Sequence, residues 1–103
     1  MIANMSIKER IETLGHTLPI APTPVANYIP AIKSGNEVMT SGQVPFVNGT
    51  NQFTGSIPSE QSVEDGAKAA ELCALNAIAA AATVLGGDVD RITGVKLLKV
   101  YVA

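Results

Sequence analysis

A long helix is the feature that most constrains how this 103-residue chain can fold. The sequence predicts it from Ser62 to Leu85. The hydroxyl of Ser62 suits an N-cap, and Glu64 and Asp65 lie in the first turn, where the helix dipole favours acids. Gly86 follows as a residue that commonly ends helices. Most apolar positions are alanine, so the helix can approach a sheet that carries larger side chains.

The apolar residues of this helix predict which face is buried. One stripe at helical spacing contains Val63, Ala67, Ala70, Ala74, Ala77, Ile78, Ala81 and Leu85. Asn76 interrupts the apolar run, and a buried amide needs hydrogen-bond partners, so we expect it to tie the helix to a neighbouring loop or strand. The run is shorter than the roughly 20 residues that cross a bilayer, which favours a buried helix over a membrane span.

Four shorter elements and one weaker strand pattern precede the long helix. A short helix is expected from Ser6 to Leu14, with Ser6 and Glu9 forming a capping box and Gly15 ending it. Strands are expected at Tyr28 to Lys33 and Glu37 to Ser41, joined by a tight turn at residues 34–36. A third short strand is expected within 44–47, and a weaker pattern at 53–57 suggests a returning strand.

Residues Asp90 to Val102 are predicted to form the last strand. Ile92, Leu98, Val100 and Val102 share one parity, and Val95, Leu97 and Tyr101 share the other. Both faces are largely apolar, which is typical of a strand buried on both sides. We expect one face to pack on the long helix and a second copy of the chain to cover the other. The element order predicts an α+β fold with a sheet backed by a helix.

Composition narrows the class of protein. Hydrophobic residues make up 47% of the chain and charged residues 16%, which argues for one ordered domain and for apolar surface covered by another subunit. The net charge is -2, and the seven Lys and Arg residues are scattered, so no nucleic-acid-binding stripe is predicted. The N-terminus lacks the pattern of a signal peptide, and we expect a cytoplasmic protein.

The single cysteine and the single histidine predict no disulfide and no metal site. Cys73 lies in the apolar helix, where a buried, inert thiol is the simplest interpretation.

The turn that follows the second strand is the candidate ligand site. Its residues Ser41, Gly42 and Gln43 lie at the rim of the predicted sheet, where polar groups can hold a small ligand. Gly42 would let a ligand approach the backbone, and the Gln43 side chain would brace the turn. The alternative is an ordinary turn at the end of a strand.

Several segments, taken in order and spacing, resemble one family. They are Ala26-Asn27-Tyr28-Ile29, the run from Gly35 to Pro45, the helix with Asn76, Gly86-Gly87-Asp88, and the run from Val95 to Val102. The chain resembles the RidA family, also called the YjgF or endoribonuclease L-PSP family. It is most similar to the longer subgroup with an extra N-terminal helix, and the resemblance runs from Ser6 to the last residue.

The resemblance implies a chorismate-mutase-like fold and a homotrimer whose sheets form a barrel, with a ligand cleft at each subunit interface. It implies hydrolysis of reactive enamines and imines to keto acids and ammonia, without a cofactor. Tyr28, Ser41 and Gly42 would line the cleft, with Gln43 beside them. In the family an arginine binds the substrate carboxylate, and a glutamate near the C-terminus orients or activates water.

The chain departs from this pattern because that arginine and that glutamate would lie beyond Ala103. Arg10 and Arg91 stand at other places in the element order and are not substitutes. We therefore expect residues 1–103 to form the N-terminal two-thirds of one RidA-like domain, with no catalytic residue among them. The alternatives are a non-catalytic binding or regulatory trimer and, less favoured by the acidic charge, an endoribonuclease or translation inhibitor.

Overall fold

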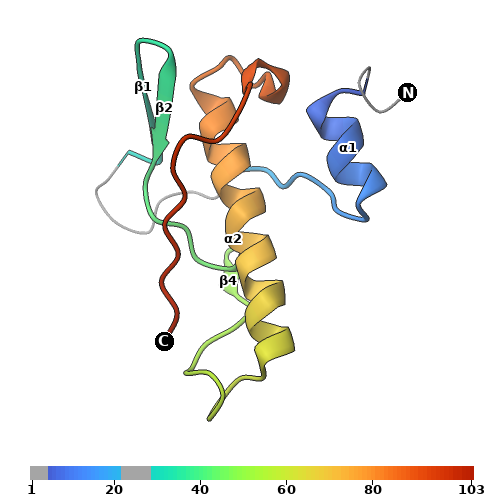
Figure 1. The fold of residues 1–103 in the computed structure, drawn as a ribbon, viewed down its shortest axis with the longest axis vertical. Coiled ribbons are helices and arrows are strands. Elements are labelled where there is room, and N and C mark those ends of the chain that lie inside the picture. Colours follow the sequence, from blue (N-terminus) through green and yellow to red (C-terminus); the bar gives the residue numbers. More distant parts are fainter. Residues whose placement is uncertain (1–4, 22–28) are drawn as a thin grey trace.

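The long helix forms the centre of the computed structural model, which describes residues 5–21 and 29–103 (Figure 1). Helix α2 runs over Val63–Thr83. The Ser62 hydroxyl accepts a hydrogen bond from the Asp65 amide at 3.0 Å, and Gly86 follows the helix at a φ of 69°. The prediction of this helix, including its N-cap, is confirmed.

The buried face of α2 differs from the predicted stripe in its first half. Val63 is 72% exposed, and Ala67, Ala70 and Ala74 are also exposed. The buried residues are Asn76, the run Ala79 to Ala82, and Leu85, and a half-buried line of Ala69, Leu72 and Cys73 leads up to them. Because apolar residues surround most of this helix, their spacing alone does not select the inner face.

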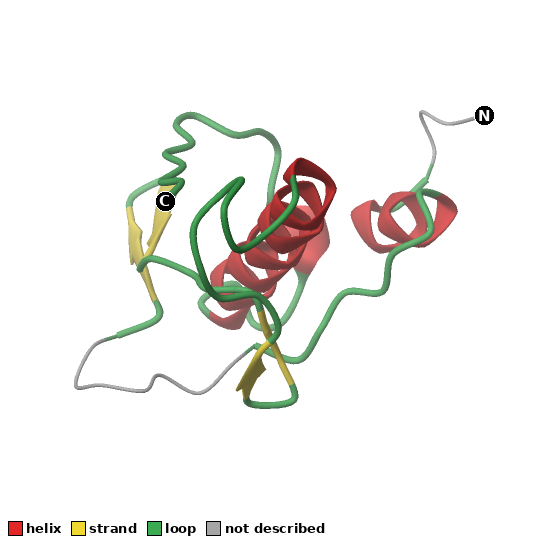
Figure 2. Cartoon of the chain, turned by 90° about the horizontal axis from the view of Figure 1, so that it is seen from below, coloured by secondary structure: helices red, strands yellow, loops and turns green. Residues whose placement is uncertain are grey.

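The short helix α1 covers Ile7–Thr13 and lies across α2 from the first β-hairpin (Figures 1 and 2). The Ser6 hydroxyl accepts from the Glu9 amide at 3.1 Å, as the capping box predicts. Asp90, in the 3-10 helix η2 (Val89–Arg91), accepts a hydrogen bond from the Ile7 amide at 2.6 Å. Ile11 is the buried residue of α1. The helix is therefore attached to the segment that follows α2.

The strands of the described residues form two separate antiparallel hairpins rather than one sheet. Strands β1 (Ala31–Ser34) and β2 (Glu37–Thr40) pair with Ala31 opposite Thr40 and Ser34 opposite Glu37. Gly35, at a φ of 58°, occupies the first central position of their two-residue turn. This hairpin is confirmed, although Tyr28, at the predicted start of its first strand, lies outside the described residues.

The second hairpin is shorter than the first. Strand β3 (Phe46–Val47) falls within the predicted third strand and pairs with β4 (Thr50–Asn51). Asn48 and Gly49 form the turn, both with positive φ, which is the backbone pattern that tight hairpins favour. The returning strand expected at 53–57 is wrong, because the chain reverses earlier, at Asn48 and Gly49.

The strand predicted from Asp90 to Val102 is also wrong in this structure. After η2 the described chain has no further helix or strand, and Val95, Leu97, Leu98, Val100, Tyr101 and Val102 are all exposed, Tyr101 by 89%. Alternating apolar residues form a strand only where a neighbouring strand completes the hydrogen-bond ladder. Within residues 29–103 no ladder joins this segment to another strand.

Two contacts nevertheless fix the course of this segment. Lys96 forms an ion pair with Glu37, and the Ala103 carbonyl accepts a hydrogen bond from the Ile57 amide at 2.8 Å. In Figure 1 the segment crosses in front of the C-terminal part of α2 and then runs down beside this helix, on the side of the first hairpin.

Helix α2 contacts β1, β2 and β3, so both hairpins are held on one central helix (Figure 2). The structure confirms an α+β fold with antiparallel sheets and a long helix. Among the described residues, neither helix has the length and apolar character needed to cross a lipid bilayer.

Candidate functional site

The predicted ligand-binding residues Ser41, Gly42 and Gln43, called here the 41–43 turn, follow directly after β2. The Ser41 amide donates to the Pro30 carbonyl at 2.9 Å, and the Ser41 hydroxyl donates to the same oxygen at 3.3 Å. These bonds extend the pairing of the first hairpin past its last ladder residues. The start of the turn is therefore fixed to the strand opposite.

Gln43 braces the turn, as the sequence predicts. Its side-chain Nε2 donates to the Ser41 carbonyl at 3.2 Å and lies 3.5 Å from the Ser41 hydroxyl oxygen. Both residues are half-buried. The two polar side chains of the turn thus act on each other and on Pro30. The ligand-binding role of Ser41 and Gln43 remains a prediction.

Gly42 is the open point of the turn. It is exposed, its φ lies outside the left-handed region, and a Cβ placed on it would have no heavy atom of residues 5–21 and 29–103 within 4 Å. Within the described parts of the chain, the amides of Gly42 and Gln43 donate to no other residue. An amide N–H beside an unobstructed backbone can donate a hydrogen bond to a carboxylate or carbonyl oxygen of a ligand.

Asn76 of α2 holds the segment that follows the turn. Its Nδ2 donates to the carbonyl oxygens of Val44 and Phe46, both at 3.1 Å, and the residue is only 2% exposed. The expectation that Asn76 ties the helix to a neighbouring segment is confirmed. The sequence did not indicate that the partners of Asn76 would be Val44 and Phe46, which follow directly after the 41–43 turn.

Tyr28, the remaining predicted ligand-binding residue, lies outside the described residues, so its position relative to the turn stays a prediction. The ion pair between Lys96 and Glu37 lies at the other end of β2 from Ser41, about 13 Å away at the usual rise of a strand. Both of its side chains are largely exposed. This pair therefore belongs to the C-terminal segment and not to the turn.

The two arginines that the sequence analysis set aside are on other elements. Arg10 lies on α1, and the Arg91 guanidinium is 3.5 Å from the Leu85 carbonyl just after α2. Cys73 is half-buried in α2, and burial raises the pKa of its thiol, which keeps it protonated and weakly nucleophilic. This agrees with the interpretation of an inert thiol.

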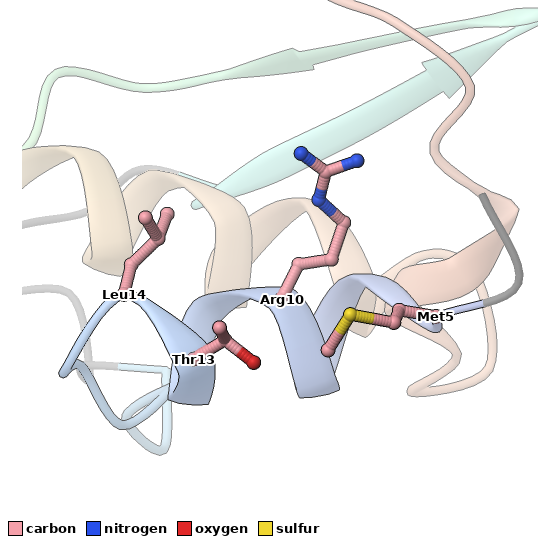
Figure 3. Close-up of a pocket in the computed structure, with 4 residues that line it drawn as sticks. All are labelled: Met5, Arg10, Thr13 and Leu14. Carbon is pink, nitrogen blue, oxygen red and sulfur yellow. The ribbon is translucent and has the colours of Figure 1, made fainter. Parts of the chain in front are cut away.

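A surface hollow lies elsewhere, along α1. It is lined by Met5, Arg10, Thr13 and Leu14, with the Arg10 side chain extending away from the helix (Figure 3). Its volume is about 120 Å³, whereas small-molecule pockets measure roughly 300–1,000 Å³. None of its residues was a candidate in the sequence analysis, and its small size gives no reason to make it one.

Residues 8–102 match the protein family described as "YjgF/chorismate mutase-like, putative endoribonuclease". Protein TCP17 of Trypanosoma cruzi is 32% identical over 102 residues, which are 99% of this chain and 63% of that protein.

Two solved structures are similar in both fold and sequence. The crystal structure of Atu1372, a protein of unknown function from Agrobacterium tumefaciens, has a TM-score of 0.71 and 40% identity, covering 82% of this chain and 50% of that one. The crystal structure of a "putative endoribonuclease" from Shewanella oneidensis has a TM-score of 0.73 and 32% identity. The match covers 80% of this chain and 54% of that one. The chain thus spans about half to two thirds of the length of these relatives.

Proposed function

Because the chain belongs to the YjgF/chorismate mutase-like family, which is the RidA family, we propose that it provides the ligand-binding turn of a RidA-like protein. That protein would hydrolyse reactive enamines and imines to keto acids and ammonia. The observation that carries the proposal is the geometry of the 41–43 turn, which is braced on both sides and open at Gly42.

The chemistry requires a site that holds a small, planar, carboxylate-bearing ligand. The amides of Gly42 and Gln43 would donate to a ligand oxygen, while the Ser41 hydroxyl, turned to Pro30, would keep the strand end in place. A planar enamine or imine would lie against the backbone of Gly42, where no side chain of the described residues intervenes. Tyr28 would line the same cleft.

Catalysis would also need the carboxylate-binding arginine and the water-activating glutamate that the family resemblance implies. Residues 1–103 are proposed to be the N-terminal part of one RidA-like domain, with both catalytic groups supplied outside them. What supports this is that the chain spans only about half of each similar solved structure.

A homotrimer is proposed as the assembled state. Its support is the run of exposed apolar side chains from Val95 to Val102, since a surface of this kind calls for cover. Light scattering of the purified protein should give three times the chain mass, and a monomer at micromolar concentration would contradict the trimer.

The test of the proposed activity is ammonia release from 2-aminoacrylate generated in situ by a pyridoxal-phosphate lyase. The full-length protein should accelerate release above the spontaneous rate, and heat-inactivated protein at the same concentration is the control. A rate equal to that of the control would reject hydrolysis by this protein.

A second candidate is a non-catalytic trimer that binds or senses a small keto acid. It is favoured by one observation: the polar side chains of the turn, Ser41 and Gln43, donate to carbonyl groups of the chain itself, so they shape the turn for binding. Saturable binding of 2-oxobutanoate together with no acceleration of ammonia release would select it.

An endoribonuclease is a third candidate, since the family description and the Shewanella protein carry that word. The net charge of -2 gives it little electrostatic support. Retention and cleavage of a single-stranded RNA at low salt would favour it over the other two.

A further inference from the structure

The buried amide of Asn76 reaches from the central helix to the chain immediately after the 41–43 turn. We propose that Asn76 is a positioning residue for this turn, setting where the backbone of Gly42 and Gln43 stands relative to α2. The effect of Asn76 on ligand binding rests on the proposed function. The structural part of the proposal stands on contacts within the chain.

The turn is held at two points, and Asn76 provides one of them. At the first point, Ser41 is bonded to Pro30 across the hairpin, which places the start of the turn relative to β1. At the second point, Asn76 Nδ2 lies 3.1 Å from the carbonyl oxygens of both Val44 and Phe46. Gly42 and Gln43 lie between these points. Their position is therefore set jointly by the hairpin and by the helix.

An asparagine suits this position because its amide nitrogen carries two hydrogens, one for each carbonyl. The Val44 oxygen also accepts from the Phe46 amide at 2.7 Å, so both of its lone pairs are used around Pro45. With Asn76 only 2% exposed, an apolar side chain there would remove one donor from each of the two carbonyls, beside a buried helix face. The segment would then shift to regain partners.

Such a shift would matter for a ligand held by backbone amides. A displacement of about 1 Å at the contacting groups is enough to weaken a positioned interaction severely. Loss of Asn76 should therefore act on the turn more than on the fold as a whole. A merely structural role would instead lower protection of all core amides together.

The test measures amide hydrogen exchange in Asn76→Leu, with Leu85→Ala as the matched control. Leu85 is buried just after α2, nine residues beyond Asn76 in the sequence, and its truncation should destabilise the same core. In Asn76→Leu, exchange at Ser41 and Phe46 should rise about tenfold more than at Ala79 to Ala82, as expected for the loss of two hydrogen bonds. In Leu85→Ala the rise at the turn should not exceed that in α2. Parallel rises in both variants would overturn the proposal.

If Asn76→Leu does not fold, Asn76→Gln answers the same question, because it keeps the amide and moves it outward by one methylene. Displaced amide resonances at residues 41–46 with unchanged ones at 63–70 would support positioning, and uniform changes would overturn it.

Binding of 2-oxobutanoate then separates the two proposals. Weaker binding in Asn76→Leu than in Leu85→Ala, at equal folded fractions, would support both. No binding by the unaltered protein would refute the proposed function, while the exchange comparison would still decide the role of Asn76.

Discussion

Replacing Gly42 by alanine separates binding from folding in one substitution. The backbone there is outside the left-handed region, and a Cβ would meet no heavy atom within 4 Å in the described part of the chain. Alanine therefore fits without strain and reduces the freedom of the unfolded chain, so the free energy of unfolding should stay equal or rise by about 0.4–1 kcal/mol. In a cleft where a ligand lies against this backbone, the same methyl would occupy the ligand's place.

The cost to binding follows from the size of one methyl group. Forcing an extra carbon into a packed contact costs about 1–3 kcal/mol. That range corresponds to an affinity for a small keto acid about 5- to 150-fold lower, at about 1.4 kcal/mol per factor of ten. Stability and affinity should thus move in opposite directions.

The assay pairs urea unfolding with calorimetric titration of 2-oxobutanoate. Gly94→Ala is the matched control, since Gly94 also has an open Cβ position and no left-handed φ. The control should show the same small stability change with unaltered affinity. If Gly42→Ala bound the keto acid as tightly as the unaltered protein, the assignment of the 41–43 turn as the ligand contact would be refuted.

Three further substitutions or measurements test the fold. Gly55→Ala should lower the free energy of unfolding by about 2–4 kcal/mol, because alanine disfavours the φ of 109° and its Cβ would lie 2.7 Å from that of Glu60; an unchanged urea midpoint would contradict this. Ser62→Ala should cost about 1 kcal/mol through loss of the bond from the Asp65 amide, with an unchanged denaturant slope; a loss below 0.3 kcal/mol, on the order of surface changes, would argue against the cap. Cys73 should be alkylated by iodoacetamide more slowly in the folded protein than in urea at pH 8, because burial raises its thiol pKa. The unfolded thiol then ionises first as pH rises, so the Cys73 contribution to stability is complete below the unfolded pKa and is lost as pH rises through the folded pKa; equal alkylation rates in both states would contradict this.

Local signals predicted the elements that local chemistry determines. The caps at Ser6 and Ser62 and the glycines at 15, 35 and 86 each act within a few residues, and the helix and hairpin boundaries follow them closely. The position of the 41–43 turn was predictable for the same reason, because the residues of the turn themselves end the preceding strand.

The inner face of α2 could not be read from the sequence in the same way. Alanines surround the helix, so the hydrophobic pattern leaves several faces nearly equivalent. Asn76 marks the inner face, and its partners are backbone carbonyl groups 32 and 30 residues earlier in the chain. Backbone carbonyls carry no residue identity, so the sequence indicated only that Asn76 needed partners.

The segment from Val95 to Val102 shows a second limit. Its alternation is that of a buried strand, yet burial and a hydrogen-bond ladder come from a neighbour and not from the segment itself. In the described chain it is held only by the Lys96 ion pair and by the bond from Ile57 to Ala103. Its apolar pattern indicates that the segment can pair as a strand, but the pattern does not identify the neighbouring strand.

The most direct test of the central claim, that the 41–43 turn contacts a small keto acid, is a titration of the protein with 2-oxobutanoate followed by amide resonances. The account predicts saturable shifts at Gly42 and Gln43, with no saturable change at the α1 hollow formed by Met5, Arg10, Thr13 and Leu14. Saturation confined to that hollow, or constant resonances at Gly42 and Gln43 up to millimolar keto acid, would contradict it.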